Sequence, residues 1–422
     1  MENKSKKEDK FSKVEDKFSN CTKTSFDIKY LLWKDNNDWG GRQLMKRILT
    51  AVICAALAVA TTGCGRKNAE KPKEKQEIVV VCSSDINDTV KGVMRRFTNS
   101  SGTTRVRLVE LSNESADVYW KTASMLADKK YDIDAMICED VWVQGFIKDG
   151  YLERLCSESE FPADVFPKGI EPFVGNGGNV YWYPLILDTG VMYYRSDKTE
   201  PVASVDLIKK GLPYAVQGTD GEEMLCCALE YINFADSAED GLRLYKENLN
   251  GSVGSDGEDY ITEFTSGNAV YMRAWTSDYS KIESRLSVPG ARLDAKLLTD
   301  DGGEYSVARA YGYSINANTD KKDSCTELLE YLKSDDVQLD ILRGKRTLPI
   351  RRGDYKNPLA LDLNSYNAAA EKDFDSHVFR PARADYAYVS REVRHALAKY
   401  LKGEETLEKA AAVMEELVNN IK

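Results

Sequence analysis

The sequence of 422 residues is poor in the residues and motifs on which most enzymes and metal sites depend. It contains only two histidines, His377 and His395, and no GxSxG, HExxH or Walker pattern. Its nine cysteines include no CxxC pair, which argues against a metal or redox cluster. We therefore expect no catalytic residue, no metal and no cofactor.

The six cysteines beyond Cys64 do not read as a disulfide framework. Cys226 and Cys227 are adjacent, and disulfide geometry rules out an ordinary bridge between neighbours. Cys82 and Cys138 both end predicted core strands and could lie side by side. We favour buried apolar thiols over disulfides.

The sequence also lacks an excess of basic residues. It has 58 Lys and Arg against 68 Asp and Glu, a formal net charge of -10. Through Cys64 the balance is 12 positive to 8 negative, so the remainder carries 46 against 60. Nucleic acid as a partner is therefore excluded, because phosphate binding needs a clustered basic surface.

No apolar run is long enough for a stop-transfer helix. The run from Ile48 to Ala60 covers about 13 residues, whereas a membrane span needs about 20. Lys46 and Arg47 precede it, and small residues lead to Cys64, which is the order of a secretory signal peptide over residues 45–64. The small residue before Cys64 resembles a bacterial lipobox, although Thr61 replaces the usual Leu. An uncleaved signal anchor is the alternative.

Both flanks of this signal are polar. Residues 65–76 are rich in Lys and Glu and read as a flexible tether. Signal peptides begin close to the start of translation, so we interpret residues 1–44 as a non-native N-terminal extension and expect translation to start at Met45. The mature chain would then be anchored through lipid on Cys64 at the extracellular face of a membrane, as in a Gram-positive cell.

The chain after the tether alternates strand and helix patterns. The run EIVVVC (Glu77 to Cys82) is typical of a buried parallel strand, and further strands are predicted over Val106 to Leu111 and Ile133 to Cys138. Helices between them predict an α/β sheet. Ligands of such sheets bind beyond the carboxyl ends of the strands. The residues at those ends are Ser83, Ser84, Glu139, Asp140 and Trp142.

The second half of the chain continues the pattern and ends in two helices. The strands are expected at Tyr214 to Gln217, Ala269 to Trp275 and Tyr311 to Asn316, and the helices at Glu222 to Phe234, Ser324 to Lys333, Val389 to Lys402 and Thr406 to Asn420. Gly403 separates the last two helices.

From about Ile78 to the C-terminus the chain resembles the family 1 extracellular solute-binding proteins, the group that contains maltose-binding protein. Three blocks carry most of the resemblance: YDIDAMICEDVWVQGFIKDGYLERL from Tyr131, VYWYPLILDTGVMYYRSD from Val180 and FTSGNAVYMRAW from Phe264. Gly312 to Asn316 and Val389 to Ala412 follow the family in the same order. The order of all blocks, more than any single one, makes the match specific.

This resemblance implies a two-lobed periplasmic-binding-protein-like fold. One lobe would comprise residues 78–187 and 313–354, and the other residues 188–312 and 355–422, with a hinge that the chain crosses several times. The implied function is capture of a carbohydrate in the cleft and its delivery to the permease subunits of an ABC importer. We expect a monomer that closes around its ligand.

The resemblance also selects site residues. A sugar needs an aromatic platform for its apolar face and polar side chains for its hydroxyl groups. Trp275 would be the platform and Asp188 an acceptor at the crossover, with alternatives as a core tryptophan and a turn residue. Weaker candidates, each equally explained by packing or exposure, are Trp182, Tyr313 and Arg346, and Tyr386 and Tyr388 precede the C-terminal helices.

Other ligands remain open. Tyr193 and Tyr194 give the neighbouring tyrosines of a ferric-ion receptor, but adjacent strand residues point to opposite faces. The acidic candidates favour a neutral or cationic ligand such as a polyamine over a phosphate. A glycan-capture lipoprotein that serves no permease is a further alternative.

Overall fold

The computed structural model describes the chain from Glu74 onward, with gaps. The predicted signal peptide, Cys64 and Arg346 lie outside the described residues, as does most of the predicted tether. In the part of the chain that is described, no helix is long and apolar enough to cross a bilayer. The described residues are 74–111, 115–128, 132–165, 174–175, 177–203, 207, 211–216, 221–253, 259–286, 288–298, 306–345, 347–361 and 377–419.

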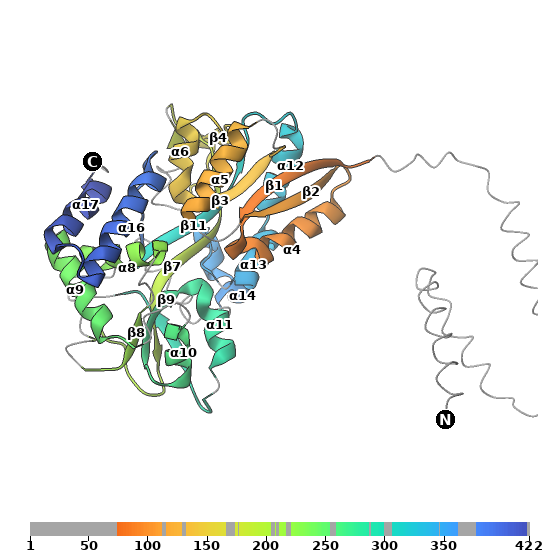
Figure 1. The fold of residues 1–422 in the computed structure, drawn as a ribbon. Coiled ribbons are helices and arrows are strands. Elements are labelled where there is room, and N and C mark those ends of the chain that lie inside the picture. Colours follow the sequence, from red (N-terminus) through yellow and green to blue (C-terminus); the bar gives the residue numbers. More distant parts are fainter. Residues whose placement is uncertain are drawn as a thin grey trace, which may run out of the picture. The chain divides into compact units, whose positions relative to one another are not determined.

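The first part of the described chain alternates strands and helices, as the sequence predicts (Figure 1). β1 (Gln76–Ser83) pairs in parallel with β2 (Thr104–Leu111) on one side and β3 (Ala135–Glu139) on the other. α4 (Ser84–Ser100) and α5 (Ser115–Ala127) connect the strands. Both faces of β1 and β3 are buried, which explains why their sequences are apolar without alternation.

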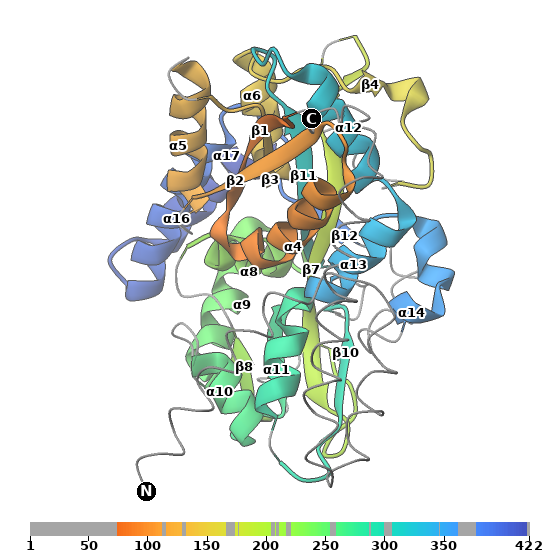
Figure 2. The ribbon, with the colours of Figure 1, turned by 90° about the vertical axis from the view of Figure 1, so that its right-hand side faces the viewer.

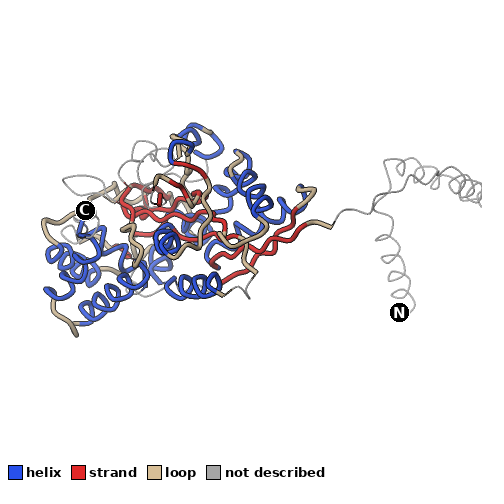
Figure 3. Tube along the Cα trace, turned by 90° about the horizontal axis from the view of Figure 1, so that it is seen from above, coloured by secondary structure: helices blue, strands red, loops and turns tan. Residues whose placement is uncertain are grey.

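Two long strands carry the sheet from this first part into the second. β7 (Tyr183–Arg195) pairs with β11 (Ser306–Ile315) over its first half and with β9 (Tyr271–Trp275) over its second half. The strand order is β2-β1-β3-β11-β7-β9-β8, with β10 on β7 and β12 on β11. The proposed lobe crossings after residues 187 and 312 thus fall inside β7 and β11. Figure 3 shows the strands at the centre with helices around them.

Gly190 marks the point where β7 changes partners. It is the first residue of β7 to pair with β9, opposite Trp275. A Cβ atom at this position would lie 2.4 Å from Oε1 of Glu230 and 2.5 Å from Nη2 of Arg273. The crossing therefore brings the backbone so close to a buried ion pair that only glycine fits without displacement.

The helices α8 (Gly221–Asn233), α9 (Ala238–Gly251), α16 (Tyr386–Lys402) and α17 (Leu407–Asn419) pack together as one group (Figure 1). Figure 2 gives a second view of the same elements. α8 packs on α9, and α16 packs on α17. The two pairs meet where α16 contacts α8 and α17 contacts α9. Gly403 ends α16 in the left-handed conformation, with φ of 76°, which confirms the predicted helix break.

The other elements complete the sheet edges and connections. They are η1 (Asp140–Trp142), α6 (Val143–Lys148), β4 (Cys156–Ser157), η2 (Glu158–Glu160), β5 (Val174–Gly175), β6 (Asn179–Val180), β8 (Tyr214–Val216), α10 (Asp259–Ser266), η5 (Thr276–Asp278), α11 (Tyr279–Arg285), β10 (Leu293–Lys296), α12 (Lys322–Leu332), α13 (Asp335–Lys345), η6 (Arg352–Lys356), α14 (Pro358–Leu361) and β12 (His377–Phe379). None of the six described cysteines is in a disulfide, and this includes Cys82 and Cys138 on the neighbouring strands β1 and β3.

Candidate functional site

The carboxyl end of β3 carries two buried carboxylates that share one arginine. Nη2 of Arg380 donates to Oε2 of Glu139 over 2.8 Å and to Oδ1 of Asp140 over 3.1 Å. Nη1 of Arg380 donates to Oε1 of Glu222, at the start of α8, over 3.1 Å. The Arg380 side chain is 1% exposed. One buried guanidinium thus joins the first part of the sheet to α8.

We call this group the Arg380 cluster: Glu139, Asp140, Glu222, Arg380, Tyr386 and Arg394. Burial and the neighbouring charges shift the pKa values in it in opposite directions. Burial raises the pKa of Asp140, and Arg380 opposes that shift. Burial disfavours the cation of Arg380, but Glu139, Tyr386 and Asp140 outweigh it, and the pKa of Arg380 rises well above its ordinary value. Tyr386 hydrogen-bonds Glu222 through its hydroxyl. The guanidinium therefore stays charged in a buried setting.

Asp188 lies in β7 and accepts hydrogen bonds from two directions. The hydroxyl of Thr276 donates to Oδ1 over 2.6 Å, and the backbone N–H and hydroxyl of Ser277 donate over 3.0 and 2.7 Å. From β11, Nε and Nη2 of Arg309 donate to Oδ2 over 3.1 and 3.0 Å. The carboxylate predicted at the crossover therefore accepts five hydrogen bonds from the protein, two of them from Arg309.

Trp275 ends β9 beside this carboxylate. Two guanidinium groups lie over its indole ring, with the carbon of Arg309 4.1 Å and that of Arg273 4.5 Å from the ring centroid. The residue is 2% exposed. Its Nε1 is buried and finds no hydrogen-bond acceptor among the described residues. A buried indole N–H without an acceptor is costly, and it is a donor available to a ligand.

The group around Trp275, which we call the Trp275 cluster (Asp188, Arg273, Trp275, Thr276, Ser277 and Arg309), adjoins the Arg380 cluster. The backbone N–H of Ala310 donates to Oδ1 of Asp140 over 3.2 Å, and Ala310 follows Arg309 directly in β11. Nη1 of Arg309 lies 3.5 Å from Oε1 of Glu223, the neighbour of Glu222 in α8. The two clusters therefore form one continuous polar region across β11.

Carboxylates outnumber guanidinium groups in this region. Arg273 is matched by the buried Glu230, at 2.7 Å between Nη2 and Oε1. The remaining charges are the carboxylates Glu139, Asp140, Asp188, Glu222 and Glu223 and the cations Arg309, Arg380 and Arg394. The region is net acidic, which suits a neutral or cationic ligand better than an anionic one.

Of the other predicted residues, some lie at the carboxyl ends of β1 and β3, and some lie within the packed interior. Ser83 is buried at the carboxyl end of β1, Ser84 begins α4, and Trp142 is buried in η1. In contrast, Nε1 of Trp182 donates to the carbonyl of Cys138 over 3.2 Å, and the hydroxyl of Tyr313 donates to that of Cys325 over 3.1 Å. Arg346 lies outside the described residues.

The arginines of this region and their partners on α8 are not predicted by the sequence patterns. Arg380 and Arg309 were not singled out, and neither were Arg273, Glu222 and Glu230. Arg273 did carry a signal, since it interrupts the apolar strand Tyr271–Trp275, and a buried charge in a strand needs an ionic partner. Which partner it takes depends on the fold.

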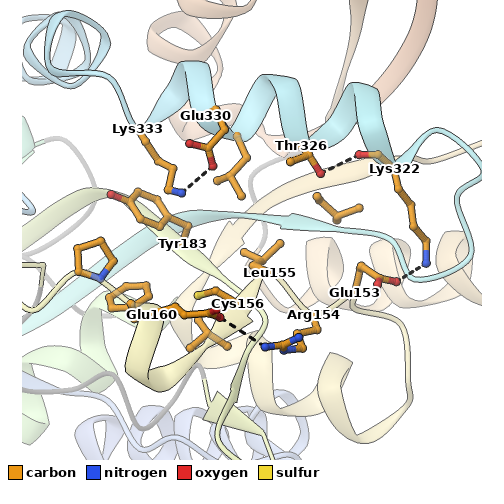
Figure 4. A pocket seen from close by; sticks show the side chains of 15 residues that line it. Glu153, Arg154, Leu155, Cys156, Glu160, Tyr183, Lys322, Thr326, Glu330 and Lys333 are labelled. Carbon is orange, nitrogen blue, oxygen red and sulfur yellow. Dashed lines mark hydrogen bonds and ion pairs between the residues drawn. The ribbon is translucent and has the colours of Figure 1, made fainter.

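A separate cavity of about 220 Å³ lies at the opposite edge of the sheet (Figure 4). Its lining includes Tyr183 and Ile315, where β7 begins and β11 ends. Ile315 pairs with Ala135 at the start of β3, whereas Glu139 ends that strand. Charged side chains at its rim are paired with one another: Lys322 with Glu153, Lys333 with Glu330 and Arg154 with Glu160. The cavity contains none of the predicted site residues.

The metal-binding potential of the site is limited in the described part of the chain. No group of three or more His, Cys, Asp and Glu side chains there is arranged to hold a metal ion. Tyr193, one of the two neighbouring tyrosines, is buried, and its hydroxyl donates to the carbonyl of Trp275 over 3.2 Å. Tyr194, on the other side of the strand, is half-buried. The two hydroxyl groups do not converge.

Solved structures with the same fold are binding proteins. The maltose-bound MalE3 of T. maritima has a TM-score of 0.70 and 19% identity over 82% of this chain and 99% of its own. The GacH receptor of Streptomyces glaucescens, studied with acarbose, has a TM-score of 0.68 and 20% identity over 83% and 100%. A solute-binding protein of Thermotoga lettingae with α-D-tagatose has a TM-score of 0.67 and 19% identity over 82% and 100%.

These neighbours have the two-lobed periplasmic-binding-protein-like fold, so the fold expected from the family resemblance is confirmed. Residues 93–358 match the family described as bacterial extracellular solute-binding protein. The matched residues make up more than half of the chain and include both the Trp275 cluster and the end of β3. The chain therefore belongs to the bacterial extracellular solute-binding protein family.

Proposed function

We propose that this protein binds a carbohydrate at the region formed by the Trp275 and Arg380 clusters. The buried indole N–H of Trp275, which has no acceptor among the described residues, supports this most directly. Sugar hydroxyl groups supply acceptors for such a donor, and they donate to carboxylates such as Asp188 and Glu139. An aromatic ring beside several carboxylates matches the two sides of a sugar, one apolar and one polar.

The individual roles follow from position. Trp275 would present its ring and N–H, and Glu139 and Asp140 would accept from ligand hydroxyl groups. Asp188 would accept from the ligand in place of Arg309. Tyr386, at the start of α16, would contact the ligand. Around them the proposed lining includes Ser83, Ser84 and Trp142, and the weaker candidates are Trp182, Tyr313 and Arg346.

The two lobes would be residues 78–187 with 313–354, and residues 188–312 with 355–422. Asp140 belongs to the first by this division, and Arg380 to the second. A ligand that contacts both can favour the closed arrangement, because only differential affinity shifts a conformational equilibrium. The hydrogen bonds of Arg380 to Glu139 and Asp140 would then form each time the lobes close.

We further propose that the protein is exported, anchored through lipid on Cys64, and delivers its ligand to an ABC permease. The family is extracellular, which supports export. The order of charged, apolar and small residues before Cys64 supports lipid attachment. The neighbours described above come from sugar-binding and ABC-transport systems, which supports a permease partner.

A thermal-shift screen of residues 65–422 tests the substrate class. Mono- and oligosaccharides, polyamines and Fe(III) are added separately, and a ligand at about 100 times its Kd stabilises by about 2.7 kcal/mol. A shift with a sugar supports the proposal. A shift only with a polyamine, which the net acidic site also suits, would keep the binding role and overturn the sugar. No shift with any compound would refute binding of all three classes.

A further inference from the structure

The side chain of Arg309 is surrounded by groups that bind cations. Its guanidinium carbon lies 4.1 Å from the ring centroid of Trp275 and 5.9 Å from that of Tyr311. Its Nε and Nη2 donate to Asp188 over 3.1 and 3.0 Å, and its Nη1 lies 3.5 Å from Oε1 of Glu223. Aromatic rings and carboxylates around one charge are the groups with which proteins bind organic cations. We call Asp188, Glu223, Trp275 and Tyr311 the cation-binding group.

This group is built from four elements of the fold, which can be followed in Figure 1. Asp188 lies in β7, Glu223 in α8, Trp275 at the end of β9 and Tyr311 in β11. Arg309 precedes Tyr311 by two residues in β11, so both side chains project from the same face of that strand. Tyr311 pairs with Glu139 of β3, which places the group next to the Arg380 cluster.

Arg309 is more exposed than the two arginines buried beside it. Its side chain is 18% exposed, compared with 3% for Arg273 and 1% for Arg380. Glu223, one of its two ionic partners, is 35% exposed and lies toward the solvent. The guanidinium of Arg309 can therefore leave Asp188 and the ring of Trp275 while it keeps a carboxylate partner.

A ligand that replaces Arg309 must also replace its charge. Asp188 is 2% exposed, and a buried carboxylate that loses its cation is strongly destabilised. The effect extends to a second carboxyl group: burial and then the charge of Asp188 raise the pKa of Asp278, and Arg309 opposes this shift. A neutral sugar compensates neither carboxyl group. A protonated amine on the ligand compensates both.

Two unpaired donors show that a charge alone does not complete the site. Nε1 of Trp275 and Nε of Arg380 are buried and find no acceptor among the described residues. Buried donors of this kind need an acceptor. The protonated nitrogens of a polyamine only donate, whereas the hydroxyl and ring oxygens of a sugar accept. The site therefore calls for a cation and for acceptor oxygens in one molecule.

We propose that the ligand is an amino sugar, whose protonated amine replaces the guanidinium of Arg309 at Asp188 and the Trp275 ring. This inference rests on the proposed carbohydrate function and refines it, because it makes a positive charge on the sugar a requirement for tight binding. The ammonium group donates to Asp188, and an oxygen of the sugar accepts from Nε1 of Trp275. Arg309 stays paired with Glu223.

Sugars that differ only at the amine test this requirement. Glucosamine, galactosamine and the disaccharide of glucosamine are titrated calorimetrically at pH 6 beside their neutral parent sugars and their N-acetyl forms. Amines with electron-withdrawing neighbours, such as α-amino groups, titrate at about pH 8, so the amino sugars are charged in this experiment. Acetylation keeps the sugar ring and removes the charge. We expect each amino sugar to bind about 30-fold tighter than both neutral counterparts.

Two variants test where the charge is bound. Asp188→Asn keeps the shape of the side chain and removes its charge, so the preference for the amino sugar should fall to about threefold or less. Arg309→Met removes the group that the ligand displaces, so the amino sugar should bind about tenfold tighter. Asp240→Asn and Arg243→Met are the matched controls, because these residues form an exposed ion pair on α9 at 2.6 Å. Both controls should bind like wild type.

The comparison of ligands on the wild type is decisive even if a variant fails to fold. A neutral sugar that binds as tightly as its amino form overturns the amino-sugar inference and leaves the carbohydrate function standing. Spermidine that binds tighter than every amino sugar also overturns it, because the sugar oxygens then contribute nothing. So does a preference that is unchanged in Asp188→Asn, or an Arg309→Met variant that gains no affinity. If the wild type binds no sugar at all, charged or neutral, the carbohydrate function itself fails.

Discussion

The guanidinium carbon of Arg309 lies 4.1 Å from the centroid of the Trp275 indole ring, while the same arginine donates two hydrogen bonds to Asp188. The face of an indole attracts a cation. A sugar ring that stacks on this face must displace the guanidinium. Asp188 would keep its three hydrogen bonds from Thr276 and Ser277 in that event. The affinity for a neutral sugar therefore depends on how much stronger the stacking of the sugar on the Trp275 ring is than the contact of Arg309 with the same ring.

Trp275→Phe tests the indole N–H without emptying the site. Trp275 is 2% exposed, so Trp275→Ala would leave a buried cavity and cost about 3–5 kcal/mol of stability. A loss of binding could then not be separated from a loss of folding. Phenylalanine keeps an aromatic face and removes the N–H. We expect calorimetry to show about tenfold weaker binding of the sugar identified in the thermal screen. Unchanged affinity would remove the indole N–H from the site.

Arg380→Met should be among the most destabilising single changes in the chain. It leaves the carboxylates of Glu139, Asp140 and Glu222 without their shared cation. Removing one partner of a buried ion pair costs about 3–5 kcal/mol, and urea denaturation at pH 7 measures it. Arg391→Met is the control, because Arg391 is about half exposed and pairs with Glu392 on the same helix at 3.5 Å. The control should change stability by less than about 0.5 kcal/mol.

The penalty of Arg380→Met should also depend on pH. Burial already raises the pKa of Asp140 while Arg380 opposes that shift, so loss of the cation raises this pKa further. A carboxyl group whose folded pKa lies above its unfolded pKa favours the folded state at low pH and disfavours it as pH rises. The difference from wild type should therefore shrink between pH 7 and pH 5. A penalty that is constant over this range would show that lost packing, not charge, dominates.

Local sequence patterns predict much of the fold. The run from Ile78 to Cys82 is apolar on both faces because helices cover both faces of β1, and the break at Gly403 needs only one left-handed residue. The first half of β11 was missed, since the prediction began at Tyr311 whereas the strand begins at Ser306. Arg309 interrupts that half, and a charge is acceptable there only because Asp188 lies opposite it in β7.

The same limit applies to the site. Glu139 and Asp140 could be predicted because they follow a buried strand directly, which is a local property. Arg380 could not, because its partners lie 241 and 240 positions earlier in the chain. A long-range ion pair leaves no periodic trace in the sequence. The family resemblance supplied Trp275 and Asp188, but not the guanidinium over the ring.

Asp197→Asn should destabilise the protein only where the carboxylate is ionised. Asp197 accepts hydrogen bonds from Nε and Nη2 of Arg195 over 2.8 and 2.7 Å and from the backbone of Arg292 over 3.0 Å. These bonds hold the pKa of Asp197 well below its ordinary value. The resulting stability is present above the unfolded pKa of about 3.9 and is lost as pH falls toward the folded pKa.

At pH 7 we therefore expect Asp197→Asn to cost about 1–3 kcal/mol, because charge-assisted hydrogen bonds to a buried arginine are weakened. Thermal unfolding of variant and wild type at pH 7, 4 and 2.5 measures the difference. The gap between the two unfolding temperatures should narrow from pH 4 to pH 2.5, because the unfolded state takes up the proton over this range while the folded state does not. An equal separation at all three values would contradict an ionic origin.

Gly190→Ala should disturb the crossing of β7 and, through it, the proposed site. The added methyl carbon would lie 2.4 Å from Glu230 and 2.5 Å from Arg273, so this buried ion pair must move. Arg273 lies over Trp275, and its displacement changes the surroundings of the indole. We expect a loss of about 1–3 kcal/mol in urea denaturation and a shift in tryptophan fluorescence. Gly102→Ala, where no atom lies within 4 Å of the new carbon, should change neither. Equal behaviour of the two variants would mean that the crossing tolerates a side chain and that Arg273 is free to rearrange.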